Sequence, residues 1–227
     1  MAYLVYLTIR NIPKDIHCKP SCHAHILLGY IPTTKLVGIG NKAACCRAVT
    51  NLFHGCMRTV LDLIAHIGET GVLMMSGDGV WRRCHPVLAI FIGDYPEQAL
   101  VTCTYNGRCS KCEVPPGHLG KYKTFLSCLQ STAINTYLLA DSNVTVFHHA
   151  CRNAGLKPVH HLFWETLPLA DIFLLITLDI LHQLLQGMMK HLIQWLTRVF
   201  GPGEVYACNT QNTPKQNTDF HLCARRD

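Results

Sequence analysis

The spacing of apolar and polar residues changes several times along this chain, and each change marks an expected element. Alternating aromatic and branched residues predict strands over residues 3–9 and 26–30. Apolar residues at helical spacing predict a helix over residues 44–67, which Gly68 and Gly71 would end. The first third of the chain is therefore expected to form two strands followed by a long helix.

The middle of the chain adds a hairpin and one more strand. Residues 72–75 and 80–83 flank the turn 76–79, whose glycines and aspartate predict a β-hairpin. The continuous apolar run 87–92 is typical of a fully buried strand. Asp94 would then stand at the carboxyl end of that strand.

The last part of the chain is expected to be mostly helical. Residues 107–120 form a knuckle rich in glycine, proline and cysteine, and residues 124–139 are compatible with a helix. A connector rich in proline and histidine runs to residue 158, and one or two helices should cover residues 171–200. The polar tail after residue 203 is expected to be disordered.

This order of elements predicts an α/β domain with an insertion. The expected divisions are a partial core over 1–100, a cysteine-containing insertion over 101–160, a helical part over 161–202 and a tail over 203–227.

The composition indicates a folded protein whose net charge suits a polyanionic partner, although mildly basic chains are common. Of 227 residues, 49% are hydrophobic and 15% are charged, which is enough to bury a core, and the formal net charge is +6. The thirteen cysteines lack the dense, even framework of a small secreted domain, and the first residues lack a basic region and a cleavage site. A reducing, nuclear or cytoplasmic setting is expected, and secretion is not.

The most apolar window, residues 167–185, favours a buried or interface helix over a membrane span. It contains Asp171, Asp179 and His182, and ionisable groups at that depth would be costly in lipid.

Two carboxylates are candidates for chemistry. Asp94 would stand where open α/β sheets present reactive groups, and magnesium prefers such oxygen ligands. The alternative is that Asp94 caps the turn that follows it. Asp179 and His182 share a helical face in very apolar surroundings, where a metal would compensate the charge. Capping of the next helix is the competing interpretation for Asp179.

Cysteine and basic residues supply two further candidate sites. Cys109 and Cys112 have the spacing of a zinc knuckle in a turn-rich segment, but a tetrahedral site needs two more ligands. Several histidines could supply them: His118, His148, His149, His161 and His182. Arg82 and Arg83, beside Trp81, could contact DNA phosphates and a base, although adjacent strand residues point to opposite faces. A solvated hairpin is the alternative.

Many ordered blocks carry a family resemblance across roughly residues 2–200. In chain order they are Tyr6-Leu7-Thr8-Ile9, Asn11-Ile12-Pro13-Lys14-Asp15-Ile16, Gly77-Asp78-Gly79 with Arg82-Arg83, Pro86-Val87-Leu88-Ala89, Gly93-Asp94-Tyr95-Pro96-Glu97-Gln98, Cys109-Ser110-Lys111-Cys112, Lys157-Pro158-Val159-His160-His161, Phe163-Trp164-Glu165, Leu167-Pro168, Asp179-Ile180-Leu181-His182-Gln183, Gly187 and Lys190-His191-Leu192-Ile193. In these blocks the chain resembles the Plavaka-type transposases of the Kyakuja–Dileera–Zisupton superfamily, which are abundant in mushroom-forming fungi.

The resemblance implies an RNase H-like core whose acidic residues bind two Mg²⁺ (or Mn²⁺) ions. In this cut-and-paste chemistry a metal-bound water cuts DNA at the transposon ends, and the freed 3′ hydroxyl attacks target DNA. It points to Asp94 and Asp179 as two acids of the set, with Asp78 and Glu165 as substitutes. Cys109 and Cys112 would belong to the family's zinc-binding insertion, and the resemblance favours His161 and His182 as further zinc ligands.

The chain departs from the family in three respects. The family's first acidic strand precedes the segment equivalent to Ala2, Arg10 stands for a glycine, and Leu4 and Leu178 each stand for a proline. The tail beyond Glu204 does not follow the family. We therefore expect a fragment that is inactive by itself. The alternatives are a non-catalytic zinc- and DNA-binding protein and a product that does not fold because its sheet has an unpaired edge.

Overall fold

The computed structural model describes residues 2–34, 36–115, 117–118 and 124–201. It divides into two compact units, Met1–Leu178 and Asp179–Asp227. The tail predicted over residues 203–227 lies outside the described residues.

The first sheet is an antiparallel pair, as the alternation of side chains predicts. Strands β1 (Ala2–Thr8) and β2 (His25–Pro32) pair with one register shift, between Val5 and Tyr6. The segment between them holds the short helix α1 (Lys14–His17) and a 3₁₀ turn (Pro20–Cys22).

Helix α2 (Lys42–Thr70) confirms the predicted helix and extends it at both ends. It begins at Lys42 because the side chain of Asn41 accepts the first free backbone N–H groups. Phe53, Met57 and Leu61 form its buried face, at the spacing that brings side chains onto one side of a helix.

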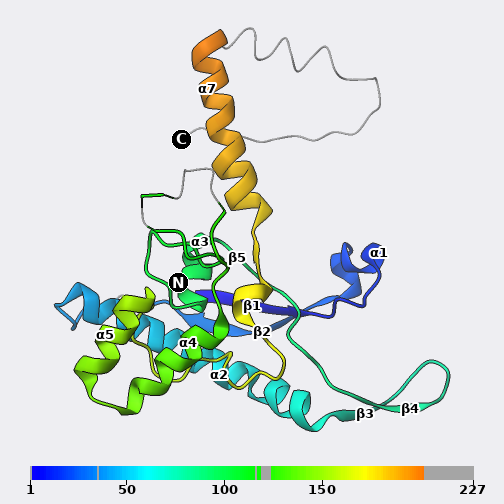
Figure 1. Cartoon of the computed structure of the whole chain (residues 1–227). Helices are drawn as coiled ribbons and strands as arrows, with labels where there is room; N and C mark the ends of the chain where they lie inside the picture. Colours follow the sequence, from blue (N-terminus) through cyan, green and yellow to red (C-terminus); the bar gives the residue numbers. More distant parts are fainter. Residues whose placement is uncertain (1, 35, 116, 119–123, 202–227) are drawn as a thin grey trace. The chain divides into compact units, whose positions relative to one another are not determined.

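The predicted hairpin is also confirmed. Strands β3 (Val72–Met75) and β4 (Trp81–Cys84) pair antiparallel and project from the end of α2 (Figure 1). Arg82 lies opposite Met74, and Arg83 lies opposite Leu73. The two arginines therefore point to opposite faces, as expected for neighbours on a strand.

The prediction of a fully buried strand over residues 87–92 is wrong. Strand β5 covers only Phe91–Gly93, and Val87 and Ile92 are 44% and 68% exposed. Its hydrogen-bonded partner is the parallel strand β6 (Ile176–Leu178), which is equally short. A strand extends only as far as its partner offers backbone groups, so the apolar run before Phe91 stays outside the sheet.

Helices form the rest of this unit, and two of their predicted boundaries change. After α3 (Tyr95–Val101), α4 (Gln130–Tyr137) is shorter than predicted and passes into a 3₁₀ turn, η2 (Leu138–Asp141). The connector expected up to residue 158 instead contains helix α5 (Val144–Ala154). The helix was missed because its sequence is rich in histidine and branched residues. Its buried residues, Phe147 and Cys151, are recognised as a packing face only in the folded core.

The region expected to be one or two helices contains a strand as well. Helix α6 (Ile172–Leu175) leads directly into β6 in the first unit. In the second unit, a π-helix (η3, Ile180–Met189) continues into α7 (Lys190–Phe200). The strand was missed because its pairing partner lies far away in the sequence, and a three-residue apolar segment has no diagnostic periodicity of its own.

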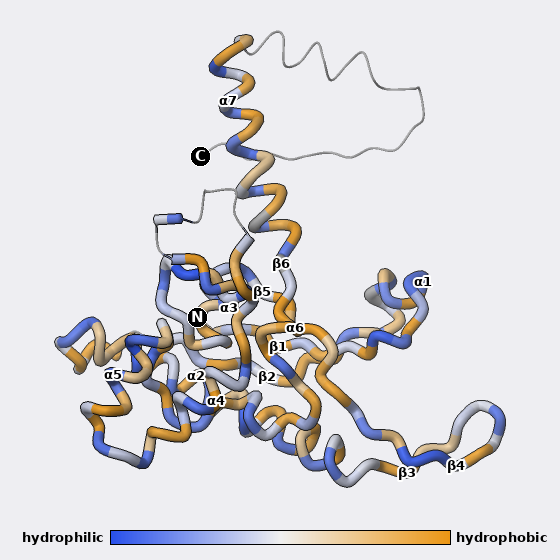
Figure 2. The backbone as a smooth tube through the Cα atoms, viewed as in Figure 1, coloured by the Kyte–Doolittle hydropathy of each residue, from blue (hydrophilic) through white to orange (hydrophobic). Residues whose placement is uncertain are grey.

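The buried core lies in the first unit and draws on all three predicted divisions of that part of the chain. Phe53 comes from the first, Phe147 from the expected insertion, and Phe163, Trp164 and Ile176 from the third. Figure 2, which colours the backbone by hydropathy, shows apolar residues in separate elements of this unit, including α2 and α6. The result is a mixed fold of helices and small sheets, compatible with the predicted α/β class.

The apolar window 167–185 resolves into short elements: the end of a turn region, α6, β6 and the start of η3. Among the described residues, none of the helices has the length and apolar character needed to cross a membrane.

Candidate functional site

Asp94 directly follows β5 and begins helix α3. Its Oδ1 accepts the backbone N–H of Glu97 at 2.9 Å, and Glu97 Oε2 accepts the backbone N–H of Asp94 at 3.3 Å. Gly93 leaves room for this return, because a Cβ there would lie 2.8 Å from Glu97 Oε2. The capping role proposed for Asp94 is therefore present in the structure, and this cap uses Oδ1 of the half-buried carboxylate.

Asp179 directly follows β6 and begins η3 in the same manner. Its Oδ1 accepts the backbone N–H of Leu181 at 2.9 Å, and its Oδ2 accepts a hydrogen bond from His182 Nδ1. The hydrogen bond from His182 holds the pKa of the Asp179 carboxyl below its ordinary value. The cap is again confirmed, together with the predicted pairing of Asp179 and His182 on one helical face.

The two strands that precede these aspartates end in register. Gly93 is the register partner of Leu178 in the parallel pair of β5 and β6. Asp94 is the next residue after Gly93, and Asp179 is the next residue after Leu178. Both candidates thus follow the carboxyl ends of neighbouring parallel strands, where open α/β sheets present reactive groups.

A buried glutamine, which the sequence did not single out, ties these strand ends together. Gln98 lies one turn into α3 and is 2% exposed. Its Nε2 donates to the carbonyl oxygens of Gly93 and Thr177 at 2.9 and 3.1 Å. In the sequence, Gln98 appears only as the last residue of the Gly93–Gln98 motif block, which does not reveal this role.

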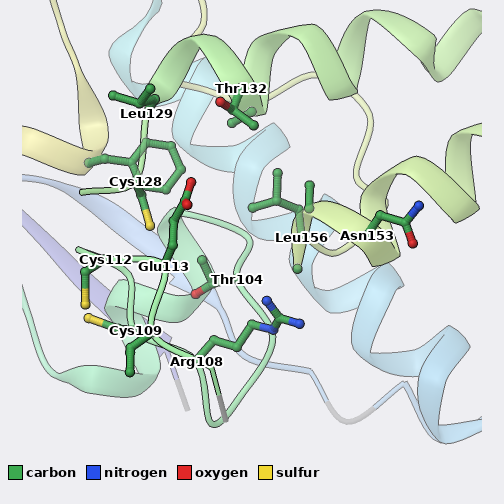
Figure 3. Close-up of a pocket in the computed structure, with 15 residues that line it drawn as sticks. Thr104, Arg108, Cys109, Cys112, Glu113, Cys128, Leu129, Thr132, Asn153 and Leu156 are labelled. Atoms are coloured by element: carbon green, nitrogen blue, oxygen red, sulfur yellow. The ribbon is translucent and has the colours of Figure 1, made fainter. Parts of the chain in front are cut away.

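A cavity of about 340 Å³ is lined by the predicted knuckle and by one unforeseen thiol. Figure 3 shows Cys109, Cys112 and Cys128 at this cavity. Cys128 arrives there because Cys112 and Ser127 form an antiparallel bridge, with Cys128 N–H donating to the Lys111 carbonyl at 3.0 Å. That pairing is also the reason why α4 begins later than predicted.

The chemistry of the thiols suits a soft metal, but their placement does not yet close a site. Cys109 Sγ accepts the backbone N–H of Lys111 at 3.3 Å. Burial is the main cause that raises the pKa of the Cys112 thiol, and the neighbouring Cys109 raises it further. Burial is also the main cause that raises the pKa of the Cys128 thiol, to about 11. In the part of the chain that the structure describes, no group of three His, Cys, Asp or Glu side chains is placed to hold a metal ion.

The histidines expected to complete a zinc site lie in other surroundings. His161 is not among the residues that line the cavity, and its Nδ1 lies 4.0 Å from Glu165 Oε1. His182 belongs to the second unit, where it contacts Asp179. The role of either histidine as a zinc ligand stays a prediction.

The basic residues of the hairpin differ in how their charges are used. Arg82 donates two hydrogen bonds to the carboxylate of Asp78, at 2.8 and 2.7 Å. Arg83 instead donates to the carbonyl oxygen of Thr70 at 3.0 Å and carries no ion pair among the described residues. The side chain of Trp81 on the same strand is 64% exposed. The carboxylate of Asp78, which was considered as a substitute acid, thus forms an ion pair with Arg82.

Taken together, the fold and this site define a mixed helix-and-sheet protein with acidic residues at the ends of parallel strands and a cysteine-containing loop nearby. A more specific assignment comes from the sequence family. The family model of the Plavaka transposase matches residues 1–196, and the chain belongs to this family. Comparison with curated proteins and with solved structures finds no match. The resemblance noted in the sequence is thereby confirmed.

Proposed function

We propose that this chain contributes Asp94 and Asp179 to the two-metal site of an RNase H-like, cut-and-paste DNA transposase. The observation that carries the proposal is the register of β5 and β6, whose last residues immediately precede the two aspartates. Membership of the Plavaka transposase family supports the same reaction class.

The carboxylates fit the proposed Mg²⁺ or Mn²⁺ ligands in their chemistry. Both are hard oxygen donors, and each begins a helix whose cap fixes the backbone of the aspartate. In such sites the bound metal activates water and stabilises the leaving oxygen of the DNA strand. The protein's share is to place each carboxylate directly after the end of a strand.

We expect no catalysis by this chain alone. Two-metal chemistry uses a set of acidic residues, and the resemblance to the family points to Asp94 and Asp179 as two of them. We expect these two to hold a divalent ion weakly and to support strand cleavage only when a further acid joins them.

The β3–β4 hairpin is the proposed contact with DNA. It projects from α2 (Figure 1). On its second strand an exposed tryptophan, Trp81, precedes Arg82 and Arg83. Arg83 is the stronger candidate for a phosphate contact, because Asp78 already neutralises Arg82. Trp81 could stack on an unpaired base.

Binding of Mn²⁺, followed by electron paramagnetic resonance of the free ion, tests the proposal. Asp94→Asn keeps a capping side chain but removes the charge, so it should lower the affinity for Mn²⁺ by about tenfold or more without changing the melting temperature. Asp62→Asn is the matched control, because Asp62 is exposed on α2 and belongs to no candidate site, and it should leave the affinity unchanged.

Equal affinity of the wild type and of Asp94→Asn would remove Asp94 from the acidic set. Transposon-end DNA gives the second measurement. The chain alone should bind this DNA without cutting it. If the wild type instead cuts the DNA in the presence of Mg²⁺ and Asp94→Asn does not, the expected inactivity is wrong, but the assignment of Asp94 to the acidic set is supported.

The second candidate function is a zinc- and DNA-binding protein without nuclease activity, and the thiol-lined cavity favours it. Cys109, Cys112 and Cys128 supply the soft ligands that zinc prefers, although closing a site requires their side chains to move.

Zinc stoichiometry after dialysis measures this second candidate. We expect about one ion per chain, lost in Cys109→Ser and retained in Cys18→Ser, whose thiol is exposed elsewhere. Because the pKa values of Cys112 and Cys128 are raised, zinc must displace protons, and its affinity should increase with pH. A folded chain with no bound zinc at any pH would exclude this function.

A further inference from the structure

We propose that Gln98 is a positioning residue that holds the carboxyl ends of β5 and β6 together and couples them to the Cys109–Cys112 loop. In its consequence for Asp94 and Asp179, this inference rests on the proposed function. The contacts themselves lie within the first unit and do not depend on it.

The side-chain amide of Gln98 is the bridge between the two strands. Its Nε2 donates one hydrogen to Gly93 at the end of β5 and the other to Thr177 within β6, at 2.9 and 3.1 Å. Both N–H groups of the amide are thus used. With Gln98 only 2% exposed, water cannot readily replace either bond, so the loss of the amide would leave two carbonyl oxygens poorly satisfied.

The strand pair needs such a bridge because it is so short. Each strand has three residues, and three residues of parallel pairing provide few ladder hydrogen bonds. Gln98 adds two bonds at the end of the pair from which the chain continues to Asp94 and Asp179. Its own backbone N–H donates to the Asp94 carbonyl at 2.8 Å, so the same residue also fixes the first turn of α3.

The other end of the amide reaches the cysteine loop. Ser110, between Cys109 and Cys112, is 3% exposed and donates from Oγ to Gln98 Oε1 at 3.3 Å. The next residue, Lys111, donates from Nζ to the carbonyl oxygens of Phe173 and Leu174, both at 2.9 Å.

The loop is therefore fastened both to Gln98 and to α6, the helix that runs directly into β6. A change in the chemical state of Cys109 or Cys112 can therefore reach the strand ends through the hydrogen bonds of Ser110 and Lys111. This arrangement gives the cysteine loop a mechanical role, whether or not it holds a metal.

Amide hydrogen exchange tests the bridge. Gln98→Met removes the amide but keeps the approximate volume, and we expect exchange in residues 91–93 and 176–178 to accelerate by about tenfold, because two buried hydrogen bonds are lost. Exchange in α2 and in β1–β2 should stay unchanged. Gln130→Met is the matched control, since Gln130 makes a similar pair of bonds to Ala170 and Ile172, and it should not accelerate exchange in 91–93.

Two further variants separate the two ends of the bridge. Ser110→Ala cuts the loop from Gln98 and should raise the alkylation rate of Cys109 and Cys112 several-fold, with a smaller effect on the strand ends. Gln98→Glu preserves the shape, and it takes the place of Gln98→Met if that variant does not fold; the direction of the exchange effect should be the same.

Mn²⁺ affinity links the bridge to the acidic residues. It should fall in Gln98→Met although Gln98 is not a ligand, and it should be unaffected in Gln130→Met. If the wild type binds no Mn²⁺, the proposed function fails while the exchange result still decides the bridge. Uniform acceleration of exchange across the unit, or none at the strand ends, would overturn the role of Gln98.

Discussion

Replacing Trp164 with alanine is expected to lower the free energy of unfolding by about 3–5 kcal/mol. Trp164 is fully buried, and its ring meets that of Phe173 edge to face with centroids 6.2 Å apart. Its Nε1 also donates to the carbonyl oxygen of Val101 at 2.9 Å. The residue thus joins the end of α3 to the segment that leads into α6 and β6, so a cavity here would loosen the elements beneath the candidate site.

Trp164→Phe separates packing from hydrogen bonding. It keeps much of the apolar ring but leaves the Val101 carbonyl without its donor, so a loss of about 1–3 kcal/mol is expected. Trp195→Phe, on the exposed side of α7, is the matched control and should have little effect. Urea unfolding followed by circular dichroism measures all three. A loss below about 1 kcal/mol for Trp164→Ala would contradict its central place in the core.

Acidification from pH 6.5 to pH 4 is expected to cost the fold about 3 kcal/mol through His54 alone. His54 is fully buried, and burial lowers its pKa from 6.5 to about 4. The hydrogen bonds of the ring fit the neutral form, which has one donor and one acceptor nitrogen. Nε2 donates to the Leu100 carbonyl at 3.2 Å, and Nδ1 accepts the Phe163 N–H at 3.3 Å. The neighbouring groups that titrate or carry charge are Cys103, at 3.1 Å from Nε2, and Lys157.

The folded and unfolded chains bind protons at His54 in different pH ranges, and this difference sets the direction of the pH effect on stability. Between pH 6.5 and pH 4 the unfolded chain protonates His54 while the folded chain does not, so protons favour unfolding in this window. The stability is present above pH 6.5 and is lost as the pH falls towards 4. The lowered pKa values of Asp78 and Asp179 act in a more acidic window, below the ordinary value of 3.8.

Unfolding by urea at a series of pH values measures this effect. His54→Asn should abolish most of the slope between pH 6.5 and pH 4, whereas His149→Asn, at an exposed position on α5, should retain it. An unchanged slope in His54→Asn would show that His54 does not remain neutral in the folded state.

The local elements and the family were accessible from the sequence. Alternation predicted β1, β2 and the β3–β4 hairpin, and the apolar face of α2 predicted a long helix, because these patterns repeat over neighbouring residues. Asp94 was predicted at the carboxyl end of a strand, and Asp179 was predicted to share a helical face with His182. The ordered motif blocks led to the Plavaka transposase family, which the family comparison confirms.

Three features of the site needed the tertiary structure. The length of β5 depends on β6, which lies more than eighty residues further along the chain and has too few residues for a pattern of its own. Cys128 joins the thiol-lined cavity only because its segment pairs with the knuckle. Gln98 gains its role from the carbonyl groups of two strands and from a serine of the cysteine loop.

The sequence by itself determined the strands β1 and β2, the long helix α2 and the β3–β4 hairpin, which residues carry charge or thiols, and to which family the chain belongs. Only the tertiary structure decided which strand ends precede Asp94 and Asp179 in register and what holds those ends together. The physical reason is that periodicity and capping act between residues a few positions apart. Strand register and buried hydrogen bonds instead depend on backbone groups that only folding brings into contact.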